Sequence, residues 1–162
     1  MAVDMFLKLA GCKGEAQDKS HKEEIDVLAW SWGMSQSGTM HTGGGGGGGK
    51  VSVQDISLTK YIDKSSPVLM QYCSVGKQFK DAVLTVRKAG GDNPLEYLVL
   101  TMKDVIVTSL STGGSGGEDR LTENVSLNFS QYKVEYQQQK PDGSPEGGKI
   151  PWEFDIAANA KV

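Results

Sequence analysis

The residues whose types could support catalysis or metal binding are few and widely separated. The two histidines, His21 and His41, both stand in polar, loop-like sequence, and we interpret both as solvent-exposed loop residues. Serine is plentiful, but the chain contains no GxSxG nucleophile elbow and no local Cys–His signature. The carboxylates are scattered, so the sequence predicts no acid–base pair. We therefore expect a protein that is not an enzyme and that binds no cofactor or metal.

A run of glycines imitates part of a phosphate-binding loop. Residues 44–49 followed by Lys50 match the first part of the GxxxxGK[ST] motif. That motif requires Ser or Thr next, for magnesium, and then a helix whose N-terminus binds phosphate. Here Val51 follows, and it opens a strand pattern. We interpret this run and the glycine cluster at residues 113–117 as long loops.

Cysteine usage and charge narrow the class of protein further. Cys12 and Cys73 are far apart and lack zinc-site spacing, so we expect two reduced thiols. The 162 residues carry a net charge of −3 without a cluster of Lys or Arg, which argues against nucleic-acid binding. The apolar runs are too short for a transmembrane helix, and the N-terminus lacks the basic and apolar regions of a secretion signal.

The elements that position these residues are predicted to be mostly strands, because apolar and polar residues alternate with a period of two. Slips in the apolar phase predict a bulge or bend at Gln54–Asp55 and at Ser130–Gln131. One segment, residues 25–32, has apolar residues on both faces and is predicted to be a central strand covered on both sides. The predicted strands are residues 3–9, 25–32, 51–61, 79–88, 95–110, 120–137 and 149–156.

One segment is predicted to be helical. Ser66 can cap a helix, Pro67 suits its first position, and Gly76 suits the position after its last turn. Apolar side chains between them form one helical stripe. The expected fold is therefore mainly β: a small β-barrel of two packed sheets with one α-helix at about 66–76 and long glycine-rich loops.

The strand predicted at residues 120–137 has an unusual polar face. Asn124, Ser126, Asn128 and Ser130 alternate with apolar residues, and all four are small and uncharged. An ordinary exposed strand usually carries more Lys and Glu. A neutral polar face of this kind suits a surface that lines a water-filled passage.

Blocks along the whole chain resemble the hemolysin-coregulated protein family, Hcp. They occur in the order of the family and leave no block of the chain over. The blocks are Ala2–Lys8 with Lys13–Glu15, Glu24–Gly33, Asp55–Tyr61 with Asp63–Pro67, Val107–Ser109, Gly113–Glu123, Val134–Tyr136 and Trp152. The unbroken seven-glycine run departs from the more mixed loop of the family.

Members of this family form the inner tube of the bacterial type VI secretion system, with a fold like that of phage tail tubes. The resemblance implies a homohexameric ring, and rings that stack inside a contractile sheath beneath a valine-glycine-repeat spike protein. It also implies small effectors carried in the lumen, and a cytoplasmic protein that this machine exports without a signal peptide. We expect one tube domain over residues 1–162, with no fused C-terminal effector domain, no nucleic-acid partner and no membrane insertion.

The resemblance also suggests site residues. Ser31 stands between Trp30 and Trp32, so its side chain points opposite to both. We predict that the lumen is contacted by Ser31, Asn124, Ser126 and Asn128. We predict that rings stack through the glycine loop, one hairpin turn and the C-terminal tail, at Gly46, Gly90, Gly91, Asp92 and Ala157.

A different class of protein would also fit the strands and loops. A monomeric ligand-binding or carbohydrate-binding β-sandwich would have a cleft lined by Trp30, Trp32 or Trp152. The mass in solution separates the two readings, because a ring has about six times the 17.4 kDa of one chain.

Overall fold

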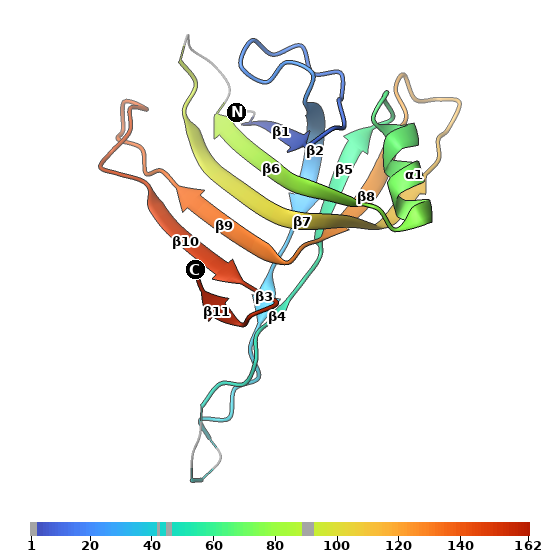
Figure 1. Cartoon of the computed structure of the whole chain (residues 1–162). Coiled ribbons are helices and arrows are strands. Elements are labelled where there is room, and N and C mark those ends of the chain that lie inside the picture. The colour runs from blue at the N-terminus through green and yellow to red at the C-terminus, as the bar shows by residue number, and fades with distance from the viewer. Residues whose placement is uncertain (1–2, 42, 45–46, 89–92) are drawn as a thin grey trace.

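The computed structural model describes residues 3–41, 43–44, 47–88 and 93–162. Antiparallel strands dominate it, and one short helix stands at the side of the sheet (Figure 1). The elements are β1 (Val3–Leu9), β2 (Ile25–Ser31), β3 (Met34–Ser35), β4 (Ser52–Val53), β5 (Ile56–Tyr61), α1 (Ser66–Val75), β6 (Gln78–Lys88), β7 (Glu96–Thr112), β8 (Thr122–Asn128), β9 (Gln131–Tyr136), β10 (Ile150–Asp155) and β11 (Ala160–Lys161).

Six strands close into the predicted barrel. Their order is β7-β6-β1-β2-β5-β8, and β8 pairs back onto β7. Strand β7 is long enough to pair with two further strands along its length: residues 98–103 pair with β9, and residues 106–112 pair with β8. Strands β9, β10 and β11 therefore extend the sheet outside the barrel (Figure 1). The two packed layers predicted from the sequence are the opposite walls of this closed sheet.

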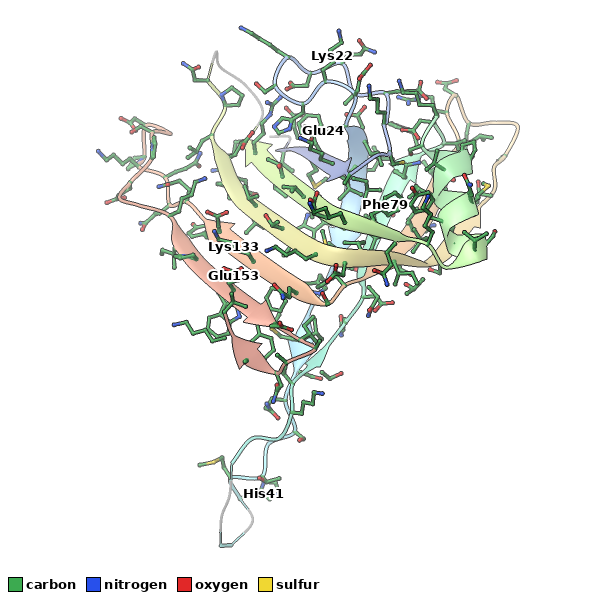
Figure 2. The ribbon with its side chains drawn as sticks, in the orientation of Figure 1. Lys22, Glu24, His41, Phe79, Lys133 and Glu153 are labelled. Carbon is green, nitrogen blue, oxygen red and sulfur yellow. The ribbon has the colours of Figure 1, made fainter. Side chains whose placement is uncertain are left out.

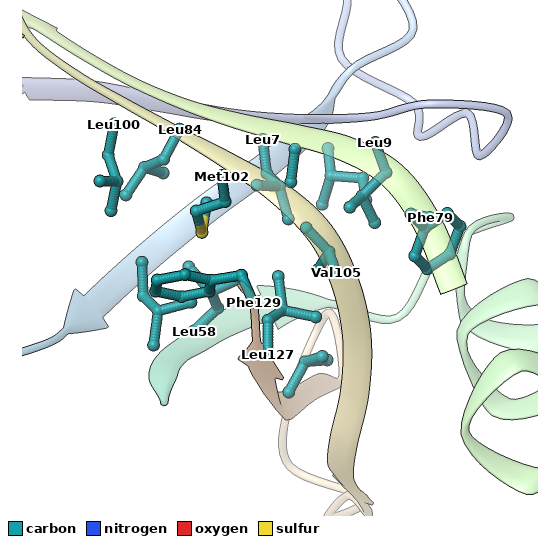
Figure 3. Packing of buried hydrophobic residues seen from close by; sticks show 14 of the residues in the cluster. Leu7, Leu9, Leu58, Phe79, Leu84, Leu100, Met102, Val105, Leu127 and Phe129 are labelled. Carbon is teal, nitrogen blue, oxygen red and sulfur yellow. The ribbon is translucent and has the colours of Figure 1, made fainter. Parts of the chain in front are cut away.

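The barrel interior is filled by the inward-facing side chains of all six strands (Figure 3). Leu7, Leu84 and Met102 meet Leu58 and Leu127 from the opposite wall, and each of the five is at most 2% exposed. Burying such a side chain contributes about 1.5–3 kcal/mol. The interior is thus a packed core and offers no passage for a ligand.

Both predicted slips in apolar phase are confirmed. The first segment breaks at Gln54–Asp55, between β4 and β5. The second breaks at Phe129–Ser130, where the chain leaves the barrel wall as β8 and continues outside it as β9. The phase changes because the side that faces the core changes when the chain turns this corner.

The prediction that residues 25–32 are covered on both faces is wrong. The pairing of β2 with β5 shifts register between Val27 and Ala29, which makes Leu28 the extra residue of a bulge. The bulge reverses the phase, so Trp30 packs against the core on the same side as Val27. Leu28 is 39% exposed, and Ala29 is exposed as well. The apolar residues that stand on both faces in the sequence pattern are explained by this bulge, because only one face of β2 packs against the core.

The predicted helix is confirmed, with a different start. It spans Ser66–Val75, and Gly76 ends it in the left-handed conformation with φ of 66°. Ser65 holds the N-cap position without a side-chain cap. The Ser66 hydroxyl instead donates a hydrogen bond to Glu123 on β8, so this residue ties the helix to the barrel. Tyr72 adds a second tie by stacking on Phe79 of β6, with 4.1 Å between ring centroids.

An arm formed by the segment around β3 and β4 extends away from the barrel (Figure 1). His41 lies on this arm and is exposed, as predicted. Figure 2 shows it at the opposite end of the molecule from Glu24. Gly46, one of the predicted stacking residues, lies outside the described residues.

Candidate functional site

A row of four serines crosses the outer wall of the barrel on neighbouring strands. The strand register pairs Ser31 of β2 with Ser57 of β5, Ser57 with Ser126 of β8, and Ser126 with Ser109 of β7. Side chains at paired positions of neighbouring strands lie on the same face. The hydroxyls of Ser109 and Ser126 are hydrogen-bonded to each other. The row is therefore a continuous band of small hydroxyl groups.

A second row runs beside it, two residues along each strand. Ala29 of β2 pairs with Thr59 of β5, Thr59 with Asn124 of β8, and Asn124 with Ser111 of β7. The Thr59 hydroxyl donates to the Asn124 side-chain carbonyl at 2.8 Å. We define the polar face as the two rows with Thr108 and Asn128; its members are Ala29, Ser31, Ser57, Thr59, Thr108, Ser109, Ser111, Asn124, Ser126 and Asn128.

The small side chains of the two rows leave a shallow depression of about 270 Å³. Its volume lies below the roughly 300–1,000 Å³ of small-molecule pockets, so it suits a protruding side chain of a partner. The residues that line it are Ala29, Trp30, Ser31, Ser57, Leu58, Thr59 and Asn124.

The four predicted lumen residues thus lie on one surface, although Ser31 is far in sequence from the other three. The structure adds Ser57 and Thr59, which sequence reasoning missed. Their signal was present, because they alternate with the buried Ile56 and Leu58. On β7, Thr108 is the extra residue of a bulge between Val107 and Ser109, and only the observed register aligns Ser109 and Ser111 with β8.

The predicted stacking residues are separate from this face. Ala157 is exposed in the turn between β10 and β11. The C-terminal tail after it is held to the sheet, since Ala160 pairs with Asp155. Gly90, Gly91 and Asp92 lie outside the described residues, like Gly46.

The interpretation of His21 as a solvent-exposed residue is wrong. Its ring is stacked on Phe6 with 4.6 Å between centroids, and the residue is 8% exposed. Nδ1 lies 2.9 Å from a Glu24 carboxylate oxygen, and Nε2 lies 2.6 Å from one of Glu96. The loop between β1 and β2 is thereby fastened to the start of β7. The sequence concealed this because Glu96 stands 75 residues later.

A second buried polar cluster joins the helix to the barrel. Lys60 of β5 and Glu123 of β8 form an ion pair, and their side chains are 1% and 0% exposed. Lys60 also lies 3.2 Å from Asp63 and donates to the Ser66 hydroxyl at 3.2 Å. Cys12 lies nearby, and burial, with the Asp63 carboxylate adding to it, raises the pKa of its thiol to about 11. The thiol is therefore protonated at neutral pH, which fits a structural residue.

The described residues contain no group of three or more His, Cys, Asp or Glu side chains that could hold a metal ion. Within the same part of the chain, no helix has the length and apolar character needed to cross a membrane. Trp30 borders the depression on the polar face, whereas Trp152 borders a separate pocket at the base of the arm.

Comparison with known proteins agrees with this geometry. The family described as "Type VI secretion system effector, Hcp" matches residues 6–136. Protein hcp1 of Pseudomonas aeruginosa (strain PAO1) is 65% identical over 162 residues, which is the full length of both chains. The crystal structure of Hcp1 from Salmonella typhimurium has a TM-score of 0.82 at 44% identity and covers 100% of both chains. Another structure, of a type six secretion system protein, has a TM-score of 0.92 at 30% identity and covers 99% of this chain and 100% of its own. None of these matches is a carbohydrate-binding module, and the chain belongs to the Hcp family of type VI secretion proteins.

Proposed function

We propose that this type VI secretion tube subunit closes into six-membered rings whose lumen is lined by the polar face, and that the lumen holds small effectors. Membership of the Hcp family supports a ring-forming tube subunit. The observation that carries the assignment of the lumen is the serine row. In this proposal residues 1–162 act as one structural domain with no catalytic role.

The chemistry of the polar face fits the wall of a passage. Its hydroxyl and amide groups hydrogen-bond water and the surfaces of many proteins, while its small side chains leave the passage wide. Many of these groups already bond to one another, as Thr108 does to Ser126 at 2.8 Å. The members of the polar face all carry small side chains, so each of their contacts with a cargo would be weak. Such a wall is suited to retaining a cargo weakly and releasing it.

Rings are proposed to stack head to tail into a tube. A head-to-tail contact uses two different surfaces, and when it does not close on itself it produces a filament. The described base of the arm and the end of β6 lie at opposite ends of the barrel (Figure 1). In the sequence, the arm and β6 lead to the two predicted stacking loops, and in this proposal these loops pair between rings. The spike protein, the contractile sheath and the effectors are the further partners in this proposal, and export through the machine follows assembly in the cytoplasm.

The substitution Ser31→Gln tests the lumen assignment. The longer side chain would fill the depression, so the ring should keep its mass in solution but retain less co-purified effector. Ser74→Gln is the matched control, because Ser74 is exposed on α1, away from the polar face. An intact Ser31→Gln ring with unchanged effector content contradicts the assignment. A monomer of 17.4 kDa for the unaltered protein at micromolar concentration contradicts the ring itself.

Cysteines placed by Gly90→Cys and Ala157→Cys test the stacking surfaces, with Cys12 and Cys73 replaced first. Oxidation should then link ring to ring and yield long tubes, visible by electron microscopy. Isolated rings, or cross-links confined to one ring, contradict this placement.

A further inference from the structure

The carboxylate of Asp55 borders the polar face, whose own members are all uncharged. Asp55 occupies the break between β4 and β5 and is half-buried. Its carboxylate accepts a hydrogen bond from the Thr108 hydroxyl at 2.7 Å and another from the Asn128 side-chain amide at 2.8 Å. The bulge in β7 places Thr108 between two ladder positions, where it reaches this carboxylate. Asp55 is thus held from two strands in one orientation.

No described residue neutralises the negative charge of Asp55 by an ion pair. Among the ion pairs of the described residues, none includes Asp55. Both of its hydrogen bonds come from neutral donors, and each carboxylate oxygen keeps the capacity to accept another. Ser57 is the next residue on the same side of the chain, about 7 Å along the strand. A fixed charge therefore stands one position from the serine row.

We infer that Asp55 makes the polar face selective for cargo segments that carry Lys or Arg, so that it is a specificity-determining residue of the lumen. This inference rests on the proposed function, because a ring repeats the carboxylate around one passage. A ring of carboxylates favours cations, and the low-dielectric protein wall strengthens its field. The two neutral rows supply contacts to a cargo that do not depend on its charge, and Asp55 adds the preference for positively charged over negatively charged cargo segments.

Peptide binding to the assembled ring measures this selectivity. The probes are three peptides of equal length that carry the same neutral fluorophore and differ only at four positions, which hold Lys, Gln or Glu. Fluorescence anisotropy at low salt should show that the unaltered ring binds the Lys peptide at least about fivefold more tightly than the Glu peptide. The preference should weaken as salt is added, because exposed charges are screened.

The variant Asp55→Asn removes the charge and keeps a side chain that can hydrogen-bond. It should bring the affinities of the Lys and Glu peptides within about twofold of each other while the ring keeps its mass. Asp142→Asn is the charge-matched control, since Asp142 lies in the loop between β9 and β10, and it should preserve the preference. The inference is overturned if the unaltered ring shows no preference or no binding, if Asp55→Asn keeps the preference, or if Asp142→Asn abolishes it equally.

A parallel measurement with Ser31→Gln separates this inference from the proposed function. If Ser31→Gln weakens the binding of all three peptides and Asp55→Asn leaves the Lys preference intact, the polar face is the cargo surface and only the charge selectivity is wrong. If Ser31→Gln leaves all three affinities unchanged, the lumen assignment fails, and the inference fails with it.

Discussion

Replacing either member of the buried pair Lys60–Glu123 should destabilise the fold strongly, and the two replacements should differ. Removing one partner of a buried ion pair typically costs about 3–5 kcal/mol, because the other charge stays buried without compensation. In Glu123→Leu, Lys60 keeps the Asp63 carboxylate at 3.2 Å and the Tyr61 carbonyl at 2.9 Å. In Lys60→Met, Glu123 keeps the Ser66 hydroxyl at 2.5 Å, and its second oxygen has no hydrogen-bond partner among the described residues.

We therefore expect about 3 kcal/mol for Glu123→Leu and about 4–5 kcal/mol for Lys60→Met. The double variant should lose less than the sum of the two, because it leaves neither charge of the pair unpaired. Urea unfolding at one fixed protein concentration measures these differences and avoids the concentration dependence of an assembled protein. Lys13→Ala is the control: its ion pair with Glu23 is exposed and should contribute less than about 1 kcal/mol. The reasoning is refuted if Lys60→Met costs no more than Lys13→Ala, or if the double variant equals the sum of the singles.

Two further predictions concern titratable groups. Burial raises the pKa of Cys12 to about 11, so only about one Cys12 thiol in a thousand is ionised at pH 8. Iodoacetamide should therefore modify Cys73 at least about tenfold faster than Cys12 in the folded protein. Equal rates for the two cysteines, measured by peptide mass spectrometry without urea, would contradict this. The hydrogen bond from Arg87 holds the pKa of Asp18 below its usual value. This interaction therefore stabilises the folded protein fully above the ordinary carboxyl pKa of about 4, and the stabilisation is lost as the pH falls through the lower pKa that Asp18 has in the folded protein. Asp18→Asn should accordingly lower the free energy of unfolding at pH 7 by about 1 kcal/mol or less, because solvent screens the pair, and this difference from the unaltered protein should shrink below about pH 4. A difference that stays the same at every pH would show that the carboxylate charge is not involved.

The strands and the helix could be predicted because their signals are local. Only nearby residues are needed to recognise the alternation around Val125 and Leu127, and the same is true of Gly76 as the residue that ends the helix. The break at Gln54–Asp55 was readable for the same reason, since a phase change is visible within a few residues. Part of the polar face can also be predicted from the sequence. The alternation in β8 identifies its members on that strand, and the position of Ser31 between two tryptophans identifies Ser31.

What could not be predicted depends on pairing between distant strands. Lys60 and Glu123 each stand in the inward phase of their strand, which signals a buried charge, but their separation of 63 positions in the sequence hides that they meet. His21 faces Glu96 only because the loop after β1 folds over the end of the barrel. The bulge at Leu28 misled the prediction for β2, because one inserted residue reverses every later side chain and mimics a strand covered on both faces.

The closure of the barrel has a consequence for how the chain folds as it is synthesised. Val3 at the N-terminal end of β1 pairs with Lys88 of β6, and β5 finds its outer neighbour only in β8, where Tyr61 pairs with Thr122. Pairings this distant are slow to form, and until they form the edges of β5 and β7 stay open to other chains. A nascent chain stopped before residue 122 would therefore be prone to aggregate. Completion of β8 covers the edge of β5 and residues 106–112 of β7, and β9 then covers residues 98–103 of β7.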